Sequence, residues 1–585
     1  MSESWPGGKR HVEMSVELNV PVKLRDGVTT RADVYRPRDE GRFPVVLSRT
    51  PYDKSSTQAY LGLRPIRAVS RGYAVVIQDV RGRYASDGEF YPLQNELSDG
   101  YDSVEWCASQ PWSNGNVGMF GGSYVGATQW LAASSGAPHL RCIAPYVTPS
   151  NYYEEWYYRG GALQLSFVES WCLNGFSASE LTRQGKTREA EKIMDVRDNM
   201  AEEAFKFLPI REIPYFRGNA DFFYDWVSHP EQDAYWDKIN LENFHRKIRV
   251  PAFSIGGWYD IFLKGTISNF SRMSGMGKTS ESRQQKLLVG PWMHGGRAAW
   301  LDKLVGDVDF GHDASNAYID MEGMILDWYD RWLKDGKKKE EDEHPIRIFV
   351  MGENAWRDEK EWPLARTLYT NYYLHSEGSA NTLEGDGALA EESPGAEPPD
   401  RFVYDPLDPA PTIGGALCCD ATYNPGGPYD QAPIERRRDV LVYSTPPLKR
   451  AIEVTGPVIL NLFASTSAGD TDFTAKLVDV WPCGYAQLLT QGIIRARYRE
   501  SRRKAKFVVP GKVYEYTIDV WPTSNLFRRD HRIRLEVSSS NFPHFDRNMN
   551  TTRPVAEESR PVIAVQQVYH DRAQQSRLVL PIIPR

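Results

Sequence analysis

The chain has 585 residues, too many for one hydrophobic core, so we expect about two to four domains. With 41% hydrophobic residues, a mean hydropathy of −0.52 and no apolar run near the length that a bilayer needs, the composition excludes a transmembrane helix. The net charge of −7, with Lys and Arg spread along the chain, excludes the basic footprint of a nucleic-acid-binding protein.

The N-terminus and the cysteines bear on location. Residues Met1–Gly8 lack the basic segment and the following apolar segment of a secretory signal. Six cysteines in a chain of this size do not make a disulfide framework, and none shows the Cys-x-x-Cys spacing of a zinc site. Cys418 and Cys419 are adjacent, which favours free thiols over a bridge between them. We therefore expect a reducing, cytoplasmic location.

The first 149 residues alternate between apolar strands and helices. This alternation is typical of a mostly parallel sheet with helices on both faces. The expected strands cover residues 13–20, 29–35, 43–48 and 74–79, and the expected helices cover 60–70 and 96–109.

The pattern changes at about residue 150. Up to about residue 245 it consists of polar and aromatic helical stretches, of which Leu181–Phe207 is the clearest, and it indicates an inserted helical cap over 150–245. Apolar strands resume over 250–255 and 286–289, and an amphipathic helix over 318–334 closes the unit. The predicted α/β core therefore comprises residues 1–149 and 246–365.

The last part of the chain has a different composition. Residues 375–400 are rich in Gly, Ser, Glu and Pro and predict a linker or a long loop. Short strands separated by Pro and Gly follow, and this spacing favours a β-sandwich or jelly roll over 366–585. These strands are expected over 454–463, 472–480, 513–520, 533–537 and 562–568.

A glycine-rich turn follows a short apolar segment and lies between the second expected helix (96–109) and the predicted cap. Gly121 and Gly122 precede Ser123, and Gly126 comes three residues after it, one residue later than in the common Gly-x-Ser-x-Gly pattern. Small residues must flank a serine held at a sharp strand-to-helix bend. The turn predicts a nucleophilic serine, although a strand-to-helix turn with no chemistry fits it equally well.

A serine hydroxyl needs a base in hydrogen-bond contact and a carboxylate that orients the base. In doubly wound α/β proteins of this kind these partners follow in the order Ser, Asp, His. Asp260 follows the first resumed strand (250–255), and His294 follows the second (286–289). Each alone could be an ordinary core or surface residue, but their order after three predicted strand ends favours a catalytic set.

Acyl transfer also needs donors aimed at the oxyanion of the tetrahedral intermediate. The backbone N–H of Tyr124, the residue after the nucleophile, is one. A second should come from the loop after an early strand, which offers the phenol of Tyr52. From the spacing alone, Tyr52 fits a surface tyrosine after a proline better than it fits a donor.

The whole set of motifs resembles the cocaine esterase group, which belongs with the serine hydrolases related to Xaa-Pro dipeptidyl peptidase. The resemblance runs nearly end to end and continues through Asp470–Phe473 and Ser540–Pro543. The motifs that carry it are Thr50-Pro51-Tyr52-Asp53-Lys54, Gln78-Asp79-Val80-Arg81-Gly82-Arg83, Gly-x-Ser-Tyr-x-Gly at 121–126, Gly257-Trp258-Tyr259-Asp260 and Gly290-Pro291-Trp292-Met293-His294.

The resemblance implies an α/β-hydrolase core, a helical cap and a C-terminal jelly roll. It also implies Ser123 as nucleophile, His294 as base and Asp260 as orienting acid. Tyr52 and Tyr124 are the implied oxyanion donors, which reverses the interpretation of Tyr52 from spacing. A Ser-His-Asp set calls for no metal and no organic cofactor.

The residues after Asp260 bear on the substrate. One branch of the family, the α-amino-acid ester hydrolases, has acidic residues there that hold a substrate ammonium, whereas this chain has Ile261, Phe262 and Leu263. An ammonium would find no counter-charge in them. Phe262 resembles the aromatic residue of the acyl pocket in cocaine esterase, and the cap residues Trp156 and Trp171 are candidates for the rest of an apolar wall.

Three functions remain open. The leading hypothesis is a serine esterase that cleaves carboxylic esters with an uncharged acyl group, aromatic or short aliphatic. The alternative is an amidase, acylase or dipeptidyl peptidase of the same fold. A remote alternative is a non-catalytic binding protein that uses the jelly roll. The expected partner is a small-molecule ester or amide, with a homodimer possible because exposed sheet edges can pair.

Overall fold

A large, mostly parallel sheet forms the frame of the first half of the chain. The computed structural model describes residues 13–60, 62–294, 303–315, 318–334 and 343–585, so the N-terminal stretch that was searched for a signal lies outside the described residues. In spatial order the described strands are β1 (Met14–Lys23), β2 (Thr29–Pro37), β4 (Ala74–Asp79), β3 (Phe43–Thr50), β5 (Ser113–Gly122), β6 (Leu140–Tyr146), β9 (Phe253–Tyr259), β10 (Lys286–Met293), β13 (Ile346–Val350) and β14 (Ala355–Glu359). The seven strands from β4 to β13 in this order are parallel, and antiparallel strands flank them at both edges.

Helices cover both faces of this sheet. Helices α2 (Glu96–Ser109) and α3 (Tyr124–Ser135) pack on one face, and α1 (Pro65–Ser70) and α11 (Met321–Leu333) pack on the other. Successive side chains of β3 point to opposite faces of the sheet. Val45 and Leu47 belong to the hydrophobic core under α2 and α3, and Val46 belongs to the core under α1 and α11. The predicted arrangement is confirmed.

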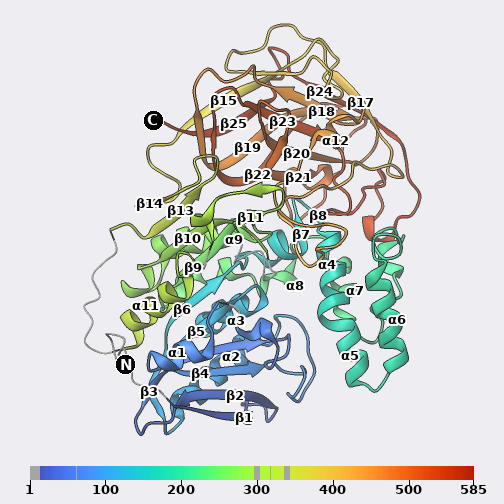
Figure 1. The fold of residues 1–585 in the computed structure, drawn as a ribbon. Helices are drawn as coiled ribbons and strands as arrows, with labels where there is room; N and C mark the ends of the chain where they lie inside the picture. The colour runs from blue at the N-terminus through green and yellow to red at the C-terminus, as the bar shows by residue number, and fades with distance from the viewer. Residues whose placement is uncertain (1–12, 61, 295–302, 316–317, 335–342) are drawn as a thin grey trace, which may run out of the picture.

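The predicted cap is the segment between β6 and β9, and its elements lie outside the large sheet. Figure 1 shows α5, α6 and α7 standing as a group beside the core. Its elements are β7 (Tyr158–Arg159), β8 (Ala162–Leu163), α4 (Leu165–Cys172), α5 (Ala178–Arg183), α6 (Thr187–Asp198), α7 (Phe222–Ser228) and α8 (Ala234–Asp237). The helical stretch expected over Leu181–Phe207 is interrupted at Gly185, which adopts a φ of 76° between α5 and α6, and its helical part ends at Asp198.

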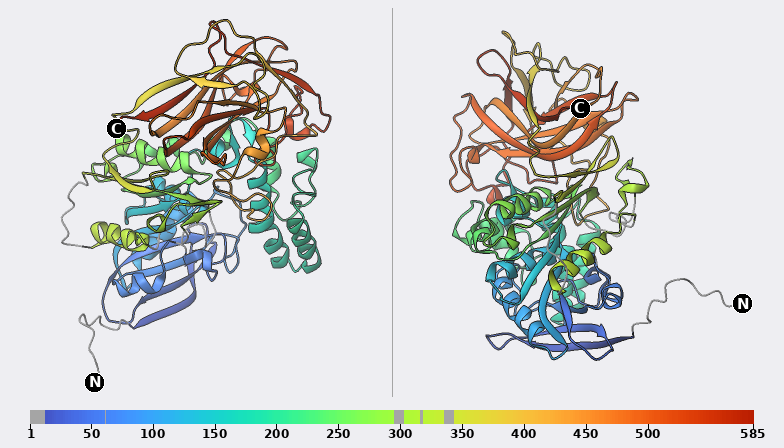
Figure 2. Two further views of the ribbon diagram at one scale, coloured as in Figure 1. Left: turned by 45° about the horizontal axis from the view of Figure 1, so that its top comes forward. Right: turned by 90° about the vertical axis from the view of Figure 1, so that its left-hand side faces the viewer.

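The C-terminal part is a β-rich domain that lies over one end of the core and touches the cap (Figures 1 and 2). Its long strand β19 (Ile452–Thr466) pairs along most of its length with β22 (Tyr514–Phe527). The segment predicted as a linker or long loop lies inside this domain and carries the short strand β16. The other described strands are β15 (Leu368–His375), β16 (Ala388–Ala390), β17 (Asp400–Tyr404), β18 (Leu441–Ser444), β20 (Asp472–Val480), β21 (Ala486–Arg495), β23 (Arg532–Ser538), β24 (Ala564–Tyr569) and β25 (Arg577–Ile583).

Direct contacts join the β-rich domain to the core next to the strand end that precedes Asp260. The phenol of Tyr259 donates a 3.1 Å hydrogen bond to the carbonyl of Leu488. Lys264, in helix α9 (Leu263–Met276), forms a 2.8 Å ion pair with Asp519 of β22. Among the described residues, no helix is both long enough and apolar enough to cross a bilayer.

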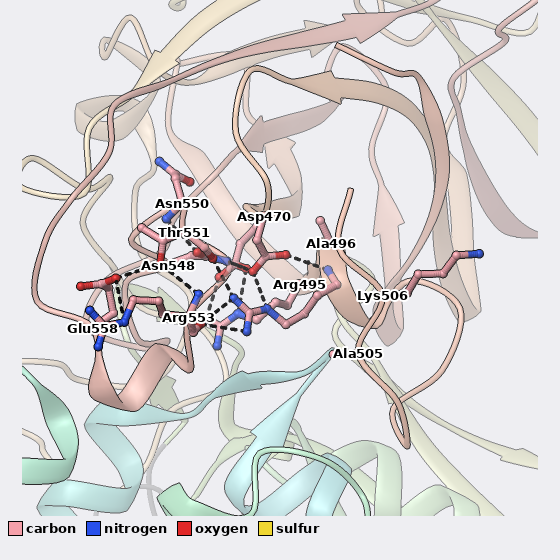
Figure 3. Close-up of polar contacts among 12 residues, drawn as sticks. Asp470, Arg495, Ala496, Ala505, Lys506, Asn548, Asn550, Thr551, Arg553 and Glu558 are labelled. Atoms are coloured by element: carbon pink, nitrogen blue, oxygen red, sulfur yellow. Dashed lines mark hydrogen bonds and ion pairs between the residues drawn. The ribbon is translucent and has the colours of Figure 1, made fainter. Parts of the chain in front are cut away.

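A buried ionic network joins the β-rich domain to the cap, next to the polar contacts of Asp470 and Asn548 that Figure 3 shows within the β-rich domain. The guanidinium of Arg495 donates 2.9 Å and 2.8 Å hydrogen bonds to the carboxylates of Asp472 and Asp546. Asp546 also accepts a 2.9 Å hydrogen bond from the backbone N–H of Leu163 in β8. All three charged side chains are almost fully buried, so each carboxylate depends on Arg495 for its counter-charge.

We expect Arg495→Met to lower the free energy of unfolding by about 3 kcal/mol, because it leaves two buried carboxylates without a cation. Urea unfolding followed by fluorescence measures the change. The matched control is Arg529→Met, which removes an arginine whose side chain is 76% exposed and pairs with Asp530 at 3.7 Å; its expected effect is below about 1 kcal/mol. Equal losses in the two variants would contradict the role given to Arg495.

Candidate active site

Ser123 occupies the sharp turn from β5 into α3. Its φ of 58° and ψ of −126° are strained for a residue with a side chain. A Cβ atom at Gly122 would lie 2.0 Å from the Tyr146 ring, and one at Gly121 would lie 2.2 Å from the Val125 side chain. A Cβ atom at Gly126 would likewise lie 2.8 Å from the Thr148 side chain. The glycines are therefore required by packing around the turn.

A chain of hydrogen bonds runs from Ser123 through His294 to Asp260. The distance from His294 Nε2 to Ser123 Oγ is 3.0 Å, and that from His294 Nδ1 to Asp260 Oδ2 is 2.6 Å. The three residues follow β5, β10 and β9 at the carboxyl edge of the parallel part of the sheet, which is where open α/β sheets place their sites. Asp260 is fully buried, and His294 is 9% exposed.

The second oxygen of Asp260 is held by the backbone. Its Oδ1 atom accepts a 2.7 Å hydrogen bond from the N–H of Phe262, which fixes the carboxylate while Oδ2 faces the histidine. The ring of Phe262 meets the His294 ring edge-on, with centroids 5.0 Å apart. The imidazole is thus held between a carboxylate and an aromatic side chain.

The backbone N–H of Tyr124 lies at the first turn of α3, where N–H groups have no partner within the helix. The side chain of Tyr124 points elsewhere: its phenol donates 2.8 Å to Glu96 and accepts 2.9 Å from the N–H of Leu93. Glu96 pairs in turn with the buried Arg49 at 2.5 Å. This network fixes the start of the helix that follows the nucleophile.

The phenol of Tyr52 lies beside Ser123. It accepts a 2.9 Å hydrogen bond from the indole N–H of Trp171 in the cap. Burial raises the pKa of the Tyr52 phenol well above its usual range, against the smaller opposing effect of its contacts with Trp171 and Ser123. The phenol therefore stays protonated and can donate a hydrogen bond toward Ser123. The reading of Tyr52 as a surface tyrosine after a proline does not match this placement.

A cavity of about 540 Å³ opens onto Ser123 and His294. Tyr52, Tyr84 and Trp171 line it together with the segment Leu417–Ala421 of the β-rich domain. The cavity is thus bounded by the core, the cap and the C-terminal domain.

The aromatic residues that were expected in the pocket occupy two layers. Trp171 lines the cavity. Trp156 and Phe262 are fully buried behind it, stacked on each other with centroids 4.6 Å apart, and Trp156 contacts Trp171 at 5.1 Å. Their placement supports the cavity wall from behind.

The segment Leu417–Ala421 was missed as a part of the site. It lies between β17 and α12 (Ala432–Glu435), in a region whose only distinctive sequence signal is the adjacent cysteine pair. The expectation of free thiols at Cys418 and Cys419 is wrong: the structure joins them in a disulfide. Cys419 adopts a φ of 72°, and this left-handed backbone, which residue order does not reveal, accompanies the bridge.

Comparisons with known proteins agree with this architecture. The family model of the X-Pro dipeptidyl-peptidase (S15 family) matches residues 26–296, and that of the X-Pro dipeptidyl-peptidase C-terminal non-catalytic domain matches residues 338–579. The fold and its site define an α/β-hydrolase with a C-terminal β-rich domain, and the chain belongs to the X-Pro dipeptidyl-peptidase S15 family. It is therefore an enzyme of the hydrolase class, and the predicted α/β-hydrolase fold is confirmed.

Within this family the chain is similar to cocaine esterase of Rhodococcus sp. (strain MB1 Bresler), with 40% identity over 98% of this chain and 99% of that protein. The resemblance to the cocaine esterase group is thereby confirmed. An aminopeptidase from a marine sediment Thaumarchaeota archaeon superposes with a TM-score of 0.81 at 26% identity, covering 100% of this chain and 99% of its own. An α-amino acid ester hydrolase gives 0.79 at 24% identity, covering 99% and 98%, and shows the shared fold.

We expect Tyr124→Phe to destabilise the protein by about 1 to 3 kcal/mol, because it leaves the buried N–H of Leu93 and one oxygen of Glu96 without a partner. Urea unfolding measures this loss. Because the backbone N–H remains, labelling of Ser123 by a fluorophosphonate should persist in the folded variant. The control Tyr369→Phe changes a tyrosine that is 54% exposed and should be neutral. Loss of labelling with unchanged stability would contradict this division between side chain and backbone.

Proposed function

We propose that the protein is a serine esterase that hydrolyses carboxylic esters with an uncharged acyl group, aromatic or short aliphatic, through an acyl-enzyme. The observation that carries the proposal is the continuous hydrogen-bond chain from Ser123 to His294 to Asp260, at 3.0 Å and 2.6 Å. This arrangement of nucleophile, base and orienting carboxylate is the one that acyl transfer to a hydroxyl requires.

The reaction begins when Ser123 Oγ attacks the ester carbonyl carbon and His294 Nε2 takes the hydroxyl proton. As the tetrahedral intermediate collapses, the bond to the alcohol oxygen breaks, and the imidazolium returns the proton to the leaving alkoxide. Water then attacks the acyl-enzyme with His294 again as base, the acid is released, and Ser123 recovers its proton. Asp260 holds the imidazole in the required tautomer and stabilises the imidazolium that forms.

The developing oxyanion receives two donors in this proposal. One is the backbone N–H of Tyr124 at the start of α3, where the helix dipole also favours negative charge. The other is the neutral phenol of Tyr52, whose orientation is fixed by the indole of Trp171. Donors held in place before the reaction stabilise the transition state because they need no reorganisation.

Apolar surroundings support an uncharged acyl group. Ile261, Phe262 and Leu263, directly after the orienting aspartate, are at most 1% exposed and offer no charge to an ammonium. Trp171 contributes an aromatic face to the cavity. The similarity to a protein named cocaine esterase supports ester substrates for this chain as well.

The alternative is hydrolysis of amides or peptides, as the names of the family model and of the aminopeptidase suggest. One observation favours it. Asp420 lines the cavity, and its Oδ2 atom is buried with no hydrogen-bond partner among the described residues. A carboxylate there could bind the ammonium of an aminoacyl substrate.

The remaining features of the sequence interpretation stay predictions. The division into a core (1–149 and 246–365), a cap (150–245) and a jelly roll (366–585) is supported by β13 and β14, which complete the large sheet before residue 360. A homodimer is supported by the edge strand β1, where Val16 and Leu18 are 44% and 64% exposed. The cytoplasmic location is a third prediction.

We expect wild-type enzyme to give a burst of p-nitrophenol from p-nitrophenyl benzoate, acetate and butyrate under rapid mixing, because acylation precedes hydrolysis of the acyl-enzyme. Ser123→Ala should abolish the burst and lower turnover by about 10⁵ to 10⁶-fold.

The control for this experiment is Ser134→Ala, which removes a hydroxyl from the far end of α3 that bonds only to the Trp130 carbonyl. It should retain the burst. Full esterase activity in Ser123→Ala would refute the proposal. Preference for an α-aminoacyl p-nitroanilide over the uncharged esters would favour the amidase alternative and assign the ammonium site to Asp420.

Tyr52→Phe should lower kcat for p-nitrophenyl benzoate by about 10² to 10³-fold with a small effect on KM, because the lost hydrogen bond acts mainly in the transition state. Steady-state kinetics separates the two parameters. Tyr84→Phe is the matched control, since Tyr84 also lines the cavity but is 41% exposed. If both variants lose kcat equally, or if only KM rises in Tyr52→Phe, the oxyanion role of Tyr52 is wrong.

A further inference from the structure

The Cys418–Cys419 disulfide forms part of the cavity wall. Both cysteines line the same cavity as Ser123 and His294, although they come from the β-rich domain. Cys418 is 8% exposed and belongs to the apolar core that contains Trp171, and Cys419 packs against that core. The bridge therefore lies in the wall that a substrate bound in the cavity would contact.

The cap anchors this segment at two points. The amide of Asn174 donates a 2.7 Å hydrogen bond to the carbonyl of Cys419, and the amide of Asn424 donates a 3.1 Å hydrogen bond to the hydroxyl of Ser166. Asn174 is followed by Gly175, where a Cβ atom would lie 3.7 Å from both Tyr52 and Trp171. The hydrogen bond from Asn174 thus places the cysteine loop beside the aromatic side of the cavity.

The bridge and its reduced form differ in shape and polarity. A disulfide between neighbouring residues closes a small ring that includes their peptide bond, so the backbone at Cys419 is held at its positive φ of 72°. Two separate thiols would release that ring, and residues with a side chain rarely keep such a φ without support. Reduction also replaces one compact apolar group by two weak hydrogen-bond donors.

We propose that the Cys418–Cys419 disulfide is a redox-controlled wall of the acyl pocket, which favours bulky aromatic acyl groups when it is oxidised and loses that preference when it is reduced. The inference rests on the esterase function proposed above. Disulfides are rare in reducing compartments, and those that occur there are usually catalytic or redox-sensing. Its place in the wall of the cavity that opens onto Ser123 gives the bridge this significance.

The switching step is a thiol–disulfide exchange with a dithiol. One thiolate of the dithiol attacks a sulfur of the bridge, the Cys418–Cys419 S–S bond breaks, and a mixed disulfide forms. The second thiol of the dithiol then displaces the enzyme sulfur. Two electrons and two protons pass to the enzyme, which ends with two thiols, while the reductant ends as a disulfide. Both cysteines line the cavity and Cys419 is partly exposed, which gives a small dithiol access to the bridge.

The first measurement counts thiols in the full chain. The other cysteines, Cys107, Cys142, Cys172 and Cys483, carry thiols. Alkylation of the denatured protein followed by intact mass spectrometry should therefore add four labels without reductant and six after dithiothreitol, out of six cysteines in the chain. Six labels without reductant in protein purified and denatured in air would overturn the proposal.

The second measurement compares kcat/KM for p-nitrophenyl benzoate and acetate, which share a leaving group and differ only in the acyl group. The ratio of benzoate to acetate should fall about tenfold when the bridge is reduced, the discrimination that a change in a pocket wall typically gives. The Cys418→Ser/Cys419→Ser double variant should show the low ratio and no response to dithiothreitol. Cys483→Ser, which removes the exposed thiol, should respond as the wild type does.

These outcomes separate the two proposals. A burst that depends on Ser123, together with a ratio that stays constant while the label count rises from four to six, overturns the redox wall and leaves the esterase function intact. Absence of a burst in both redox states overturns the esterase function and, with it, this inference. Because dithiothreitol acts on the wild-type enzyme, the test stands even if the double variant fails to fold.

Discussion

The chain passes from β5 into α3 at Ser123 with a φ of 58°, a backbone conformation that costs free energy for any residue with a side chain. The surrounding structure holds the turn in place. The Ser123 N–H donates 3.0 Å to the carbonyl of Tyr146, and three glycines admit neighbouring side chains that a Cβ atom would displace. This turn exposes the hydroxyl at the sheet edge, within 3.0 Å of His294.

The rest of the site depends on buried polar groups that fix elements against one another. Arg49, Glu96 and Tyr124 hold the start of α3, and the Phe262 N–H holds the Asp260 carboxylate. Such groups are costly to bury singly, and each is therefore paired. The same rule applies where the β-rich domain meets the cap, at Arg495 and the carboxylates of Asp472 and Asp546. The C-terminal domain also contributes the segment Leu417–Ala421 to the wall of the cavity.

Local pattern was sufficient for much of the fold. The helix over 96–109 was predicted with its observed bounds, and the strand over 74–79 likewise, because burial and periodicity agree there. The helix expected over 60–70 begins only at Pro65, since proline at the first position sets the start. Strands β21 and β25 were missed. β21 is buried along its whole length and so lacks alternation, and the buried polar residues Gln487, Thr490 and Gln491 also interrupt its apolar run.

The sequence by itself determined the residue types, their order and the glycine-flanked turn, from which Ser123, Asp260 and His294 could be chosen. It could do so because strand ends are local and parallel strands share one edge. Only the tertiary structure decided that Trp171 orients Tyr52, that Phe262 and Trp156 lie behind the cavity, and that Cys418 and Cys419 are joined within its wall. The first two depend on contacts between segments more than a hundred residues apart, and the third accompanies one left-handed backbone conformation. A local pattern encodes neither.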